Sequence, residues 1–175
     1  MKVTVDEYEF DFPSAKELYK FDETDNLSPH YHGVSVLKAV DVMAEFSNCY
    51  LWIEIKQYTE EDIERLQQEG DQRKLNDDYH TKSHLRNNLV GKYRDTFLYR
   101  YAEQKLNKPI FYVCLLNLDS ALKTHFRKEL IRFIPTGIPN NKRWKRKIIE
   151  GLIVVDEKDW ARNPKLSDFG TCKHL

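Results

Sequence analysis

The chain has 175 residues, of which 41% are hydrophobic and 13% aromatic, a composition typical of one folded domain rather than a disordered chain. Its apolar runs are too short to cross a membrane and no apolar signal segment is visible, so we expect no membrane contact. The three cysteines form no CxxC pair, which argues against a disulfide framework and a structural zinc site and favours a reduced, cytoplasmic compartment.

Charge is divided unevenly along the chain, although the formal net charge is zero. Residues 1–79 carry 19 acidic and 8 basic side chains, whereas residues 80–175 carry 9 acidic and 20 basic ones. A basic half indicates an anionic partner such as nucleic acid. Two alternatives stay open, because opposed halves could attract each other within one fold or bring several chains together into an oligomer.

The N-terminal third is expected to contain a ribbon, a short helix and a hairpin. Alternation of apolar and acidic residues indicates a half-buried strand, and a Pro-Ser pair is typical of a helix start. Dense aromatic and β-branched residues indicate strands, which a two-residue turn would join into a hairpin. We expect a strand or ribbon at 3–12, a short helix at 14–21, a loop at 22–33, and strands at 34–46 and 49–58 joined by a turn at 47–48.

In the rest of the chain, helices alternate with strands, which predicts an α/β fold with a mixed central sheet flanked by helices, in a single domain over residues 1–175. Large apolar residues recur every four positions from Leu85 to Tyr101, as on one face of a long helix. The acidic stretch 59–79 is too polar for a strand and favours a solvated helix or a mobile excursion. The other expected elements are a strand at 110–118, a helix at 122–133, a short basic helix at 141–149 and a strand at 152–155.

Two carboxylates face each other across the predicted hairpin. If the turn holds two residues, Asp41 lies directly opposite Glu54 on the same face of the sheet, and Lys56 lies one step beyond. Carboxylates about 4 Å apart repel each other by about 4 kcal/mol at an effective dielectric of about 20, so an apolar strand would carry them only around a cation. Mg²⁺ binds carboxylate, water and phosphate oxygens, and Lys56 could orient or deprotonate an attacking water.

Two alternatives to this site follow from the same residues. Glu45 shares the face of Asp41 and competes with it as a metal ligand. The hairpin could also carry its charged side chains on a solvated face without any metal. The apolar sequence of the strand at 49–58 favours the buried site, because a central strand does not bury charges without a compensating partner.

The pattern Asp41-x12-Glu54-Ile55-Lys56, on adjacent strands followed by an amphipathic helix and another strand, resembles the PD-(D/E)xK nuclease superfamily. The resemblance implies a restriction-endonuclease-like αβββαβ core over about residues 13–118, and a Mg²⁺-dependent endonuclease that hydrolyses phosphodiester bonds in DNA more readily than in RNA. It implies that Asp41 and Glu54 bind Mg²⁺ or Mn²⁺, that the backbone carbonyl of Ile55 adds a ligand, and that Lys56 acts on the attacking water. It also implies that Glu17 could be a further carboxylate near the metal.

The C-terminal part of the domain, residues 120–160, is basic. Its densest segment surrounds one tryptophan with five basic residues: Lys142, Arg143, Trp144, Lys145, Arg146 and Lys147. Basic groups contact phosphates and tryptophan stacks on bases, so this segment predicts contact with nucleic acid, and Arg86, Lys92 and Arg94 could extend the patch. An ordinary solvated basic helix with Trp144 in the core is the alternative. For the whole chain, the alternative to an enzyme is a non-catalytic nuclease-like module that binds nucleic acid or a partner protein.

Overall fold

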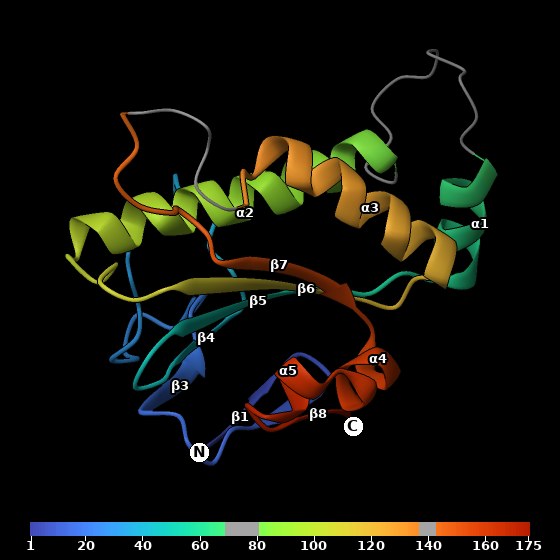
Figure 1. The fold of residues 1–175 in the computed structure, drawn as a ribbon. Helices are drawn as coiled ribbons and strands as arrows, with labels where there is room; N and C mark the ends of the chain where they lie inside the picture. Colours follow the sequence, from blue (N-terminus) through green and yellow to red (C-terminus); the bar gives the residue numbers. More distant parts are fainter. Residues whose placement is uncertain (69–80, 137–142) are drawn as a thin grey trace.

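The structure is a computed structural model, which describes residues 1–68, 81–136 and 143–175. Two β-sheets lie one above the other, and two long helices cover the outer face of the larger sheet (Figure 1). The predicted mixed sheet flanked by helices is therefore confirmed. Within the described residues, no helix combines the length and the apolar character needed to cross a membrane.

The larger sheet has five strands in the order β3-β4-β5-β6-β7, with β5 in the centre. Strands β3, β4 and β5 are antiparallel to one another, whereas β6 and β7 continue the sheet in parallel with β5. Parallel neighbours need long crossover connections, and helices occupy both of them. The strands are β3 (Glu17–Lys20), β4 (Val42–Glu45), β5 (Tyr50–Lys56), β6 (Ile110–Leu116) and β7 (Gly151–Val155).

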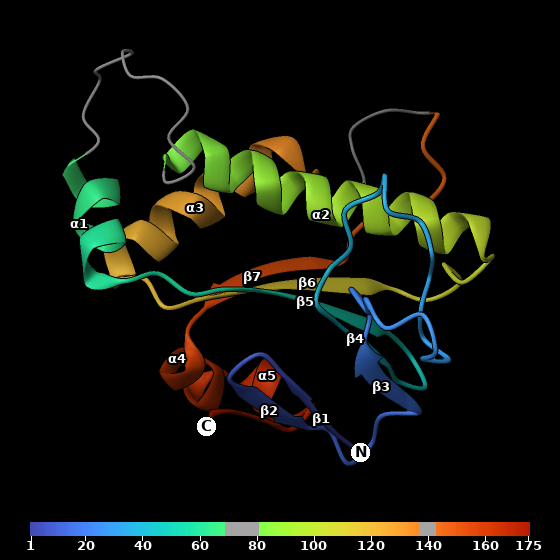
Figure 2. The same ribbon diagram turned by 180° about the vertical axis from the view of Figure 1, so that it is seen from behind.

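Helices α2 (Lys82–Ala102) and α3 (Ser120–Phe133) lie side by side on one face of this sheet (Figures 1 and 2). The interface is aromatic, with the Tyr93 ring 5.5 Å from the Trp52 ring and 5.2 Å from the Tyr112 ring. Each such fully buried large side chain stabilises the fold by about 1.5–3 kcal/mol. The short helix α1 (Glu60–Gln68) precedes α2 and buries Leu66 against the same core.

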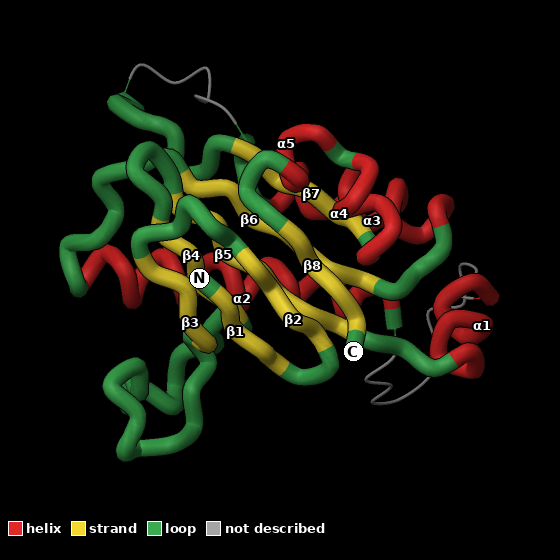
Figure 3. The backbone as a smooth tube through the Cα atoms, turned by 90° about the horizontal axis from the view of Figure 1, so that it is seen from below, coloured by secondary structure: helices red, strands yellow, loops and turns green. Residues whose placement is uncertain are grey.

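The opposite face packs against a second sheet with the strand order β1-β2-β8 (Figure 3). The Trp160 ring stacks on Phe12 at a centroid distance of 5.8 Å. Gly170 has a φ of +141°, and a side chain there would lie 2.1 Å from the Asp11 carbonyl oxygen, so only glycine allows this entry into the last strand. The elements of this layer are β1 (Lys2–Val5), β2 (Tyr8–Asp11), α4 (Glu157–Arg162), α5 (Pro164–Ser167) and β8 (Thr171–His174).

Several predicted elements differ in the structure. The helix expected at 14–21 is wrong, because residues 17–20 form strand β3 and pair with β4. The strand expected at 34–46 is shorter, since β4 begins only at Val42. The basic helix expected at 141–149 is also wrong within the described residues, because positions 143–150 are not helical. Helix α1 covers the start of the acidic stretch, and residues 69–79 lie outside the described residues.

Candidate active site

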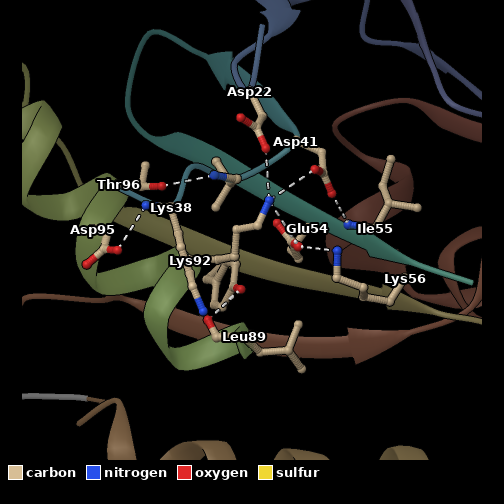
Figure 4. Close-up of polar contacts among 12 residues, drawn as sticks. Asp22, Lys38, Asp41, Glu54, Ile55, Lys56, Leu89, Lys92, Asp95 and Thr96 are labelled. Carbon is tan, nitrogen blue, oxygen red and sulfur yellow. Dashed lines mark hydrogen bonds and ion pairs between the residues drawn. The ribbon is translucent and has the colours of Figure 1, made fainter. Parts of the chain in front are cut away.

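The hairpin of β4 and β5 sets Asp41 and Glu54 opposite each other. The Phe46 amide donates a hydrogen bond of 2.9 Å to the Cys49 carbonyl, which closes the expected two-residue turn. In the hairpin, Glu45 pairs with Tyr50 at the turn, and Val42 pairs with Ile53 at the other end. The same register places Asp41 opposite Glu54 as the next pair. The predicted register is thus confirmed, and both side chains point to the face that α2 covers (Figure 4).

Glu54 is a fully buried carboxyl group on the central strand, with no exposed surface. Its Oε1 atom lies 2.8 Å from Lys56 Nζ, whereas its Oε2 atom has no hydrogen-bond partner among the described residues. Burial, followed by the nearby charge of Asp41, raises the pKa of Glu54 to about 8, while Lys92 and Lys56 oppose the rise. An additional positive charge beside Glu54 would therefore strongly stabilise its deprotonated form.

Asp41 is held at the end of β4 by main-chain hydrogen bonds. Its Oδ2 atom accepts a hydrogen bond of 2.6 Å from the Ile55 amide, and its own carbonyl accepts one of 2.8 Å from the Phe21 amide. The N–H and C=O of one strand residue point to the same side, so the Ile55 carbonyl is directed toward the edge where Asp41 lies. The predicted residues Asp41, Glu54, Ile55 and Lys56 are thus neighbours in space (Figure 4).

The loop that leads to Asp41 is fastened to α2 by two hydrogen bonds. The Lys38 amide donates to Asp95 Oδ2 at 2.9 Å, and the Val40 amide donates to the buried hydroxyl of Thr96 at 3.0 Å (Figure 4). Gly91 lets the Lys38 side chain pass close to the helix, since a Cβ atom there would lie 3.2 Å from Lys38 Cδ. Helix α2 therefore fixes the position from which the Asp41 side chain enters the site.

A second lysine, Lys92 of α2, lies between the carboxylates. Its Nζ atom is 3.0 Å from Asp22 Oδ2, 3.5 Å from Asp41 Oδ1 and 3.5 Å from Glu54 Oε1. Burial alone would lower the pKa of Lys92, but the attraction of the three carboxylates, that of Glu54 first, raises it above its usual value. Lys92 is therefore a charged part of the site, and not an extension of the basic patch.

Sequence reasoning missed the roles of Lys92 and Asp22. One signal was present: Lys92 follows Leu89 by three residues and precedes Thr96 by four, so it belongs to the buried face of α2. A lysine on an apolar helix face needs an acidic partner nearby. Asp22 had no comparable signal, because it lies in an irregular segment far from the hairpin along the chain.

The two additional carboxylates considered from the sequence lie elsewhere. Glu45 is at the turn end of the hairpin, where it forms an ion pair with Lys108. Glu17 pairs in register with Glu45 on the edge strand β3, and its side chain is exposed. The structure does not bring either residue to Asp41 and Glu54, because both occupy the opposite end of the strands.

The basic segment is exposed at positions 143–147, and several of its side chains also contact other parts of the chain. Arg146 donates a hydrogen bond of 2.9 Å to the Leu106 carbonyl, and Lys147 forms an ion pair of 2.9 Å with Glu150. Trp144 is 37% exposed, so it does not belong to the core. Arg143 and Lys145 are exposed, and Lys142 lies outside the described residues.

Carboxylate oxygens are the groups at this site that could hold a metal. Asp41 and Glu54 supply two of them, and both already contact a cation, the Lys92 ammonium. In the described ranges, no three His, Cys, Asp or Glu side chains lie close enough together to bind one metal ion jointly. Comparison of the chain with known protein families, with curated proteins and with solved structures found no match.

Proposed function

We propose that this protein is a Mg²⁺-dependent nuclease that hydrolyses phosphodiester bonds, in DNA rather than RNA. The observation that carries the proposal is the juxtaposition of Asp41, the fully buried Glu54 and Lys56 at one position of the central hairpin. A buried acid with an unpaired oxygen is costly for folding, and perturbed groups of this kind concentrate at functional sites.

The order of elements around the site supports a restriction-endonuclease-like core. Three antiparallel strands, β3, β4 and β5, are followed by the short helix α1, by the long helix α2 and by β6, which lies parallel to β5. This succession corresponds to the βββαβ part of the αβββαβ pattern. The third strand precedes the hairpin, at the place where the sequence pattern predicted a helix. The chain has a strand pair, β1 and β2, before this unit where the pattern has its first helix.

The donors at the site fit Mg²⁺. Mg²⁺ prefers oxygen ligands and commonly takes one or two carboxylates together with water and phosphate oxygens. Asp41 and Glu54 would hold the ion, and the Ile55 carbonyl is directed to the same edge. The free Glu54 Oε2 atom gives the ion a buried acceptor that no described side chain satisfies.

The reaction we propose is attack of water on phosphorus, with cleavage of one P–O bond and transfer of a proton to the leaving oxygen. A bound Mg²⁺ would polarise the phosphoryl oxygen and lower the pKa of water. Lys56 is 32% exposed while its Nζ atom lies beside Glu54, so it reaches both the buried acid and an incoming substrate. It would orient the attacking water and neutralise the charge that develops on the phosphate.

Cleavage of plasmid DNA tests the proposal. Plasmid, single-stranded DNA and RNA are incubated with the protein in Mg²⁺, Mn²⁺ or EDTA, and products are separated on gels. We expect DNA cleavage that needs Mg²⁺ or Mn²⁺ and stops in EDTA. Lys56→Ala should lower the cleavage rate by about 10²–10⁴-fold, because it removes a group that acts on the water, while DNA affinity changes little.

The control is Lys173→Ala, which removes an exposed lysine on β8 in the other sheet and should cleave like the wild type. Absence of cleavage with every substrate and metal would overturn the enzyme assignment. A Lys56→Ala variant as active as the wild type would remove Lys56 from the mechanism.

The alternative function is a non-catalytic module that binds nucleic acid or a partner protein. The observation that favours it is the ion-pair network itself, since Lys92 contacts both carboxylates without any metal. In that case Asp41, Glu54 and Lys92 would act as a buried polar network that stabilises the sheet. DNA binding in fluorescence anisotropy, together with intact substrate under all metal conditions, would select this function.

A further inference from the structure

The Lys92 ammonium is the point on which three acidic side chains of three different segments converge. Asp22 comes from the segment after β3, Asp41 from the residue before β4, and Glu54 from β5 (Figure 4). The three oxygens lie at unequal distances, because Asp22 is 3.0 Å from Nζ and the other two are 3.5 Å away. Asp22 is also the partner nearest to solvent, with 41% of its side chain exposed, against 13% for Asp41.

Asp41 and Glu54 are the same two carboxylates to which the proposed function assigns the metal. Lys92 contacts Asp41 Oδ1 and Glu54 Oε1, next to the Glu54 Oε2 atom that the ion would take. A divalent ion bound there would repel the Lys92 ammonium at short range and push it away from Asp41 and Glu54. Its shortest contact, the one with Asp22, lies on the outer side and need not be broken.

We infer that Lys92 is a built-in cation that competes with the metal for Asp41 and Glu54, and that Asp22 holds the displaced ammonium. This inference rests on the proposed function. Without metal, Lys92 is the cation that faces Asp41 and Glu54 and stabilises the sheet. With metal, Asp22 retains Lys92 at the rim, so Asp22 sets how easily the ion enters. Lys92 is therefore a positioning residue, because its contacts with the carboxylates set the affinity of the site for the metal.

Mn²⁺ affinity is the direct test, measured from the electron paramagnetic resonance of free Mn²⁺ and therefore independent of cleavage. Lys92→Met removes the competing charge at similar length and should bind Mn²⁺ about tenfold more tightly. The same variant should unfold at a lower temperature than the wild type in EDTA, because Asp41 and Glu54 lose their neutralising partner. Asp22→Asn removes the acceptor for the displaced ammonium and should weaken Mn²⁺ binding roughly fivefold.

The double variant separates this inference from a merely structural role. If Asp22 acts through Lys92, then Asp22→Asn should have no further effect on Mn²⁺ affinity in the Lys92→Met background. If Lys92→Met binds Mn²⁺ no more tightly than the wild type, or if Asp22→Asn weakens binding equally in both backgrounds, the inference is overturned. Should Lys92→Met fail to fold, Asp22→Asn alone decides, and unchanged or tighter binding by that variant would overturn the inference.

The outcomes also separate this inference from the proposed function. If the wild type and all variants bind no Mn²⁺ and cleave no substrate, the proposed function fails and the inference fails with it. If the wild type binds Mn²⁺ and cleaves DNA while Lys92→Met and Asp22→Asn bind Mn²⁺ like the wild type, only the inference fails.

Discussion

At the scale of single residues, Glu54 determines the electrostatics of the site. It is a completely buried acid, and its neighbours provide an incomplete set of contacts, because only one of its oxygens lies close to Lys56. Burial and the Asp41 charge raise its pKa to about 8. A metal ion would reverse this effect, because metal binding favours the deprotonated ligand and releases a proton.

The stability of the metal-free protein should depend on the protonation of Glu54. The unfolded pKa is near 4.5 and the folded pKa near 8, so between these values the folded state keeps a proton that the unfolded state has lost. Stability from this group is therefore fully present below pH 4.5 and is lost as pH rises toward 8. We predict that Glu54→Gln, which stays neutral, becomes progressively more stable than the wild type over this range.

Urea unfolding in EDTA at several pH values measures this difference. The matched control is Glu17→Gln, an exposed residue on the edge strand, whose stability should follow the wild-type pH dependence. A constant difference between Glu54→Gln and the wild type from pH 5 to about 8 would show that Glu54 does not hold its proton in the folded state.

At the scale of elements, the site depends on the contact between α2 and the loop before β4. The Val40 amide is buried, and its hydrogen bond goes to the Thr96 hydroxyl at 3.0 Å. A buried N–H that loses its acceptor costs about 1–3 kcal/mol. The hydrogen bond also fixes the residue directly before Asp41, so its loss affects both stability and the site.

We predict that Thr96→Val lowers the free energy of unfolding by about 1–3 kcal/mol and weakens Mn²⁺ binding, because the shape is kept while the acceptor is lost. Thr96→Ser keeps the hydroxyl and should retain most of the metal affinity. Denaturant unfolding and Mn²⁺ titration measure the two effects. Equal metal affinity in Thr96→Val and the wild type would mean that this hydrogen bond does not position Asp41.

The hairpin is the element that the sequence predicts best. Register in a two-residue hairpin follows from counting along the chain, so the pairing of Asp41 with Glu54 can be predicted from the sequence alone. Strand β3 cannot, because the Pro13-Ser14 helix signal is local, whereas pairing with β4 is a tertiary interaction. The contacts of Lys92 with Asp22 likewise join segments that are 70 residues apart.

In the whole molecule, some of the opposite charges of the two halves form ion pairs with each other within one chain. The three acids around Lys92 and the pair of Glu45 with Lys108 all join the acidic half to the basic half. These pairs support the interpretation that the halves attract each other within one fold. Association of several chains through opposed charges stays a prediction.

Strand β8 is a further element that the sequence does not predict, because its pairing with β2 joins the two ends of the chain.

The remaining exposed basic residues give a prediction about nucleic acid. Positions 143–147 are all exposed, and Arg146 and Lys147 in addition have partners within the chain, so the test uses Lys145. We predict that Lys145→Glu weakens DNA binding and lowers the slope of log affinity against log salt by about 1, because one phosphate contact is lost. Fluorescence anisotropy at several salt concentrations measures this slope, with Lys173→Glu on β8 as a control of equal charge change. An identical slope for wild type and Lys145→Glu would remove this segment from the DNA-binding surface.

In the proposed nuclease, Asp41 and Glu54 share one metal ion on the hairpin. The most direct measurement is a crystal structure of the protein soaked with Mn²⁺, with the ion located by its anomalous scattering. We predict a single strong peak bound by the carboxylates of Asp41 and Glu54 and by the Ile55 carbonyl, next to Lys56. Mn²⁺ bound elsewhere, or no peak between these two carboxylates at saturating Mn²⁺, would contradict it.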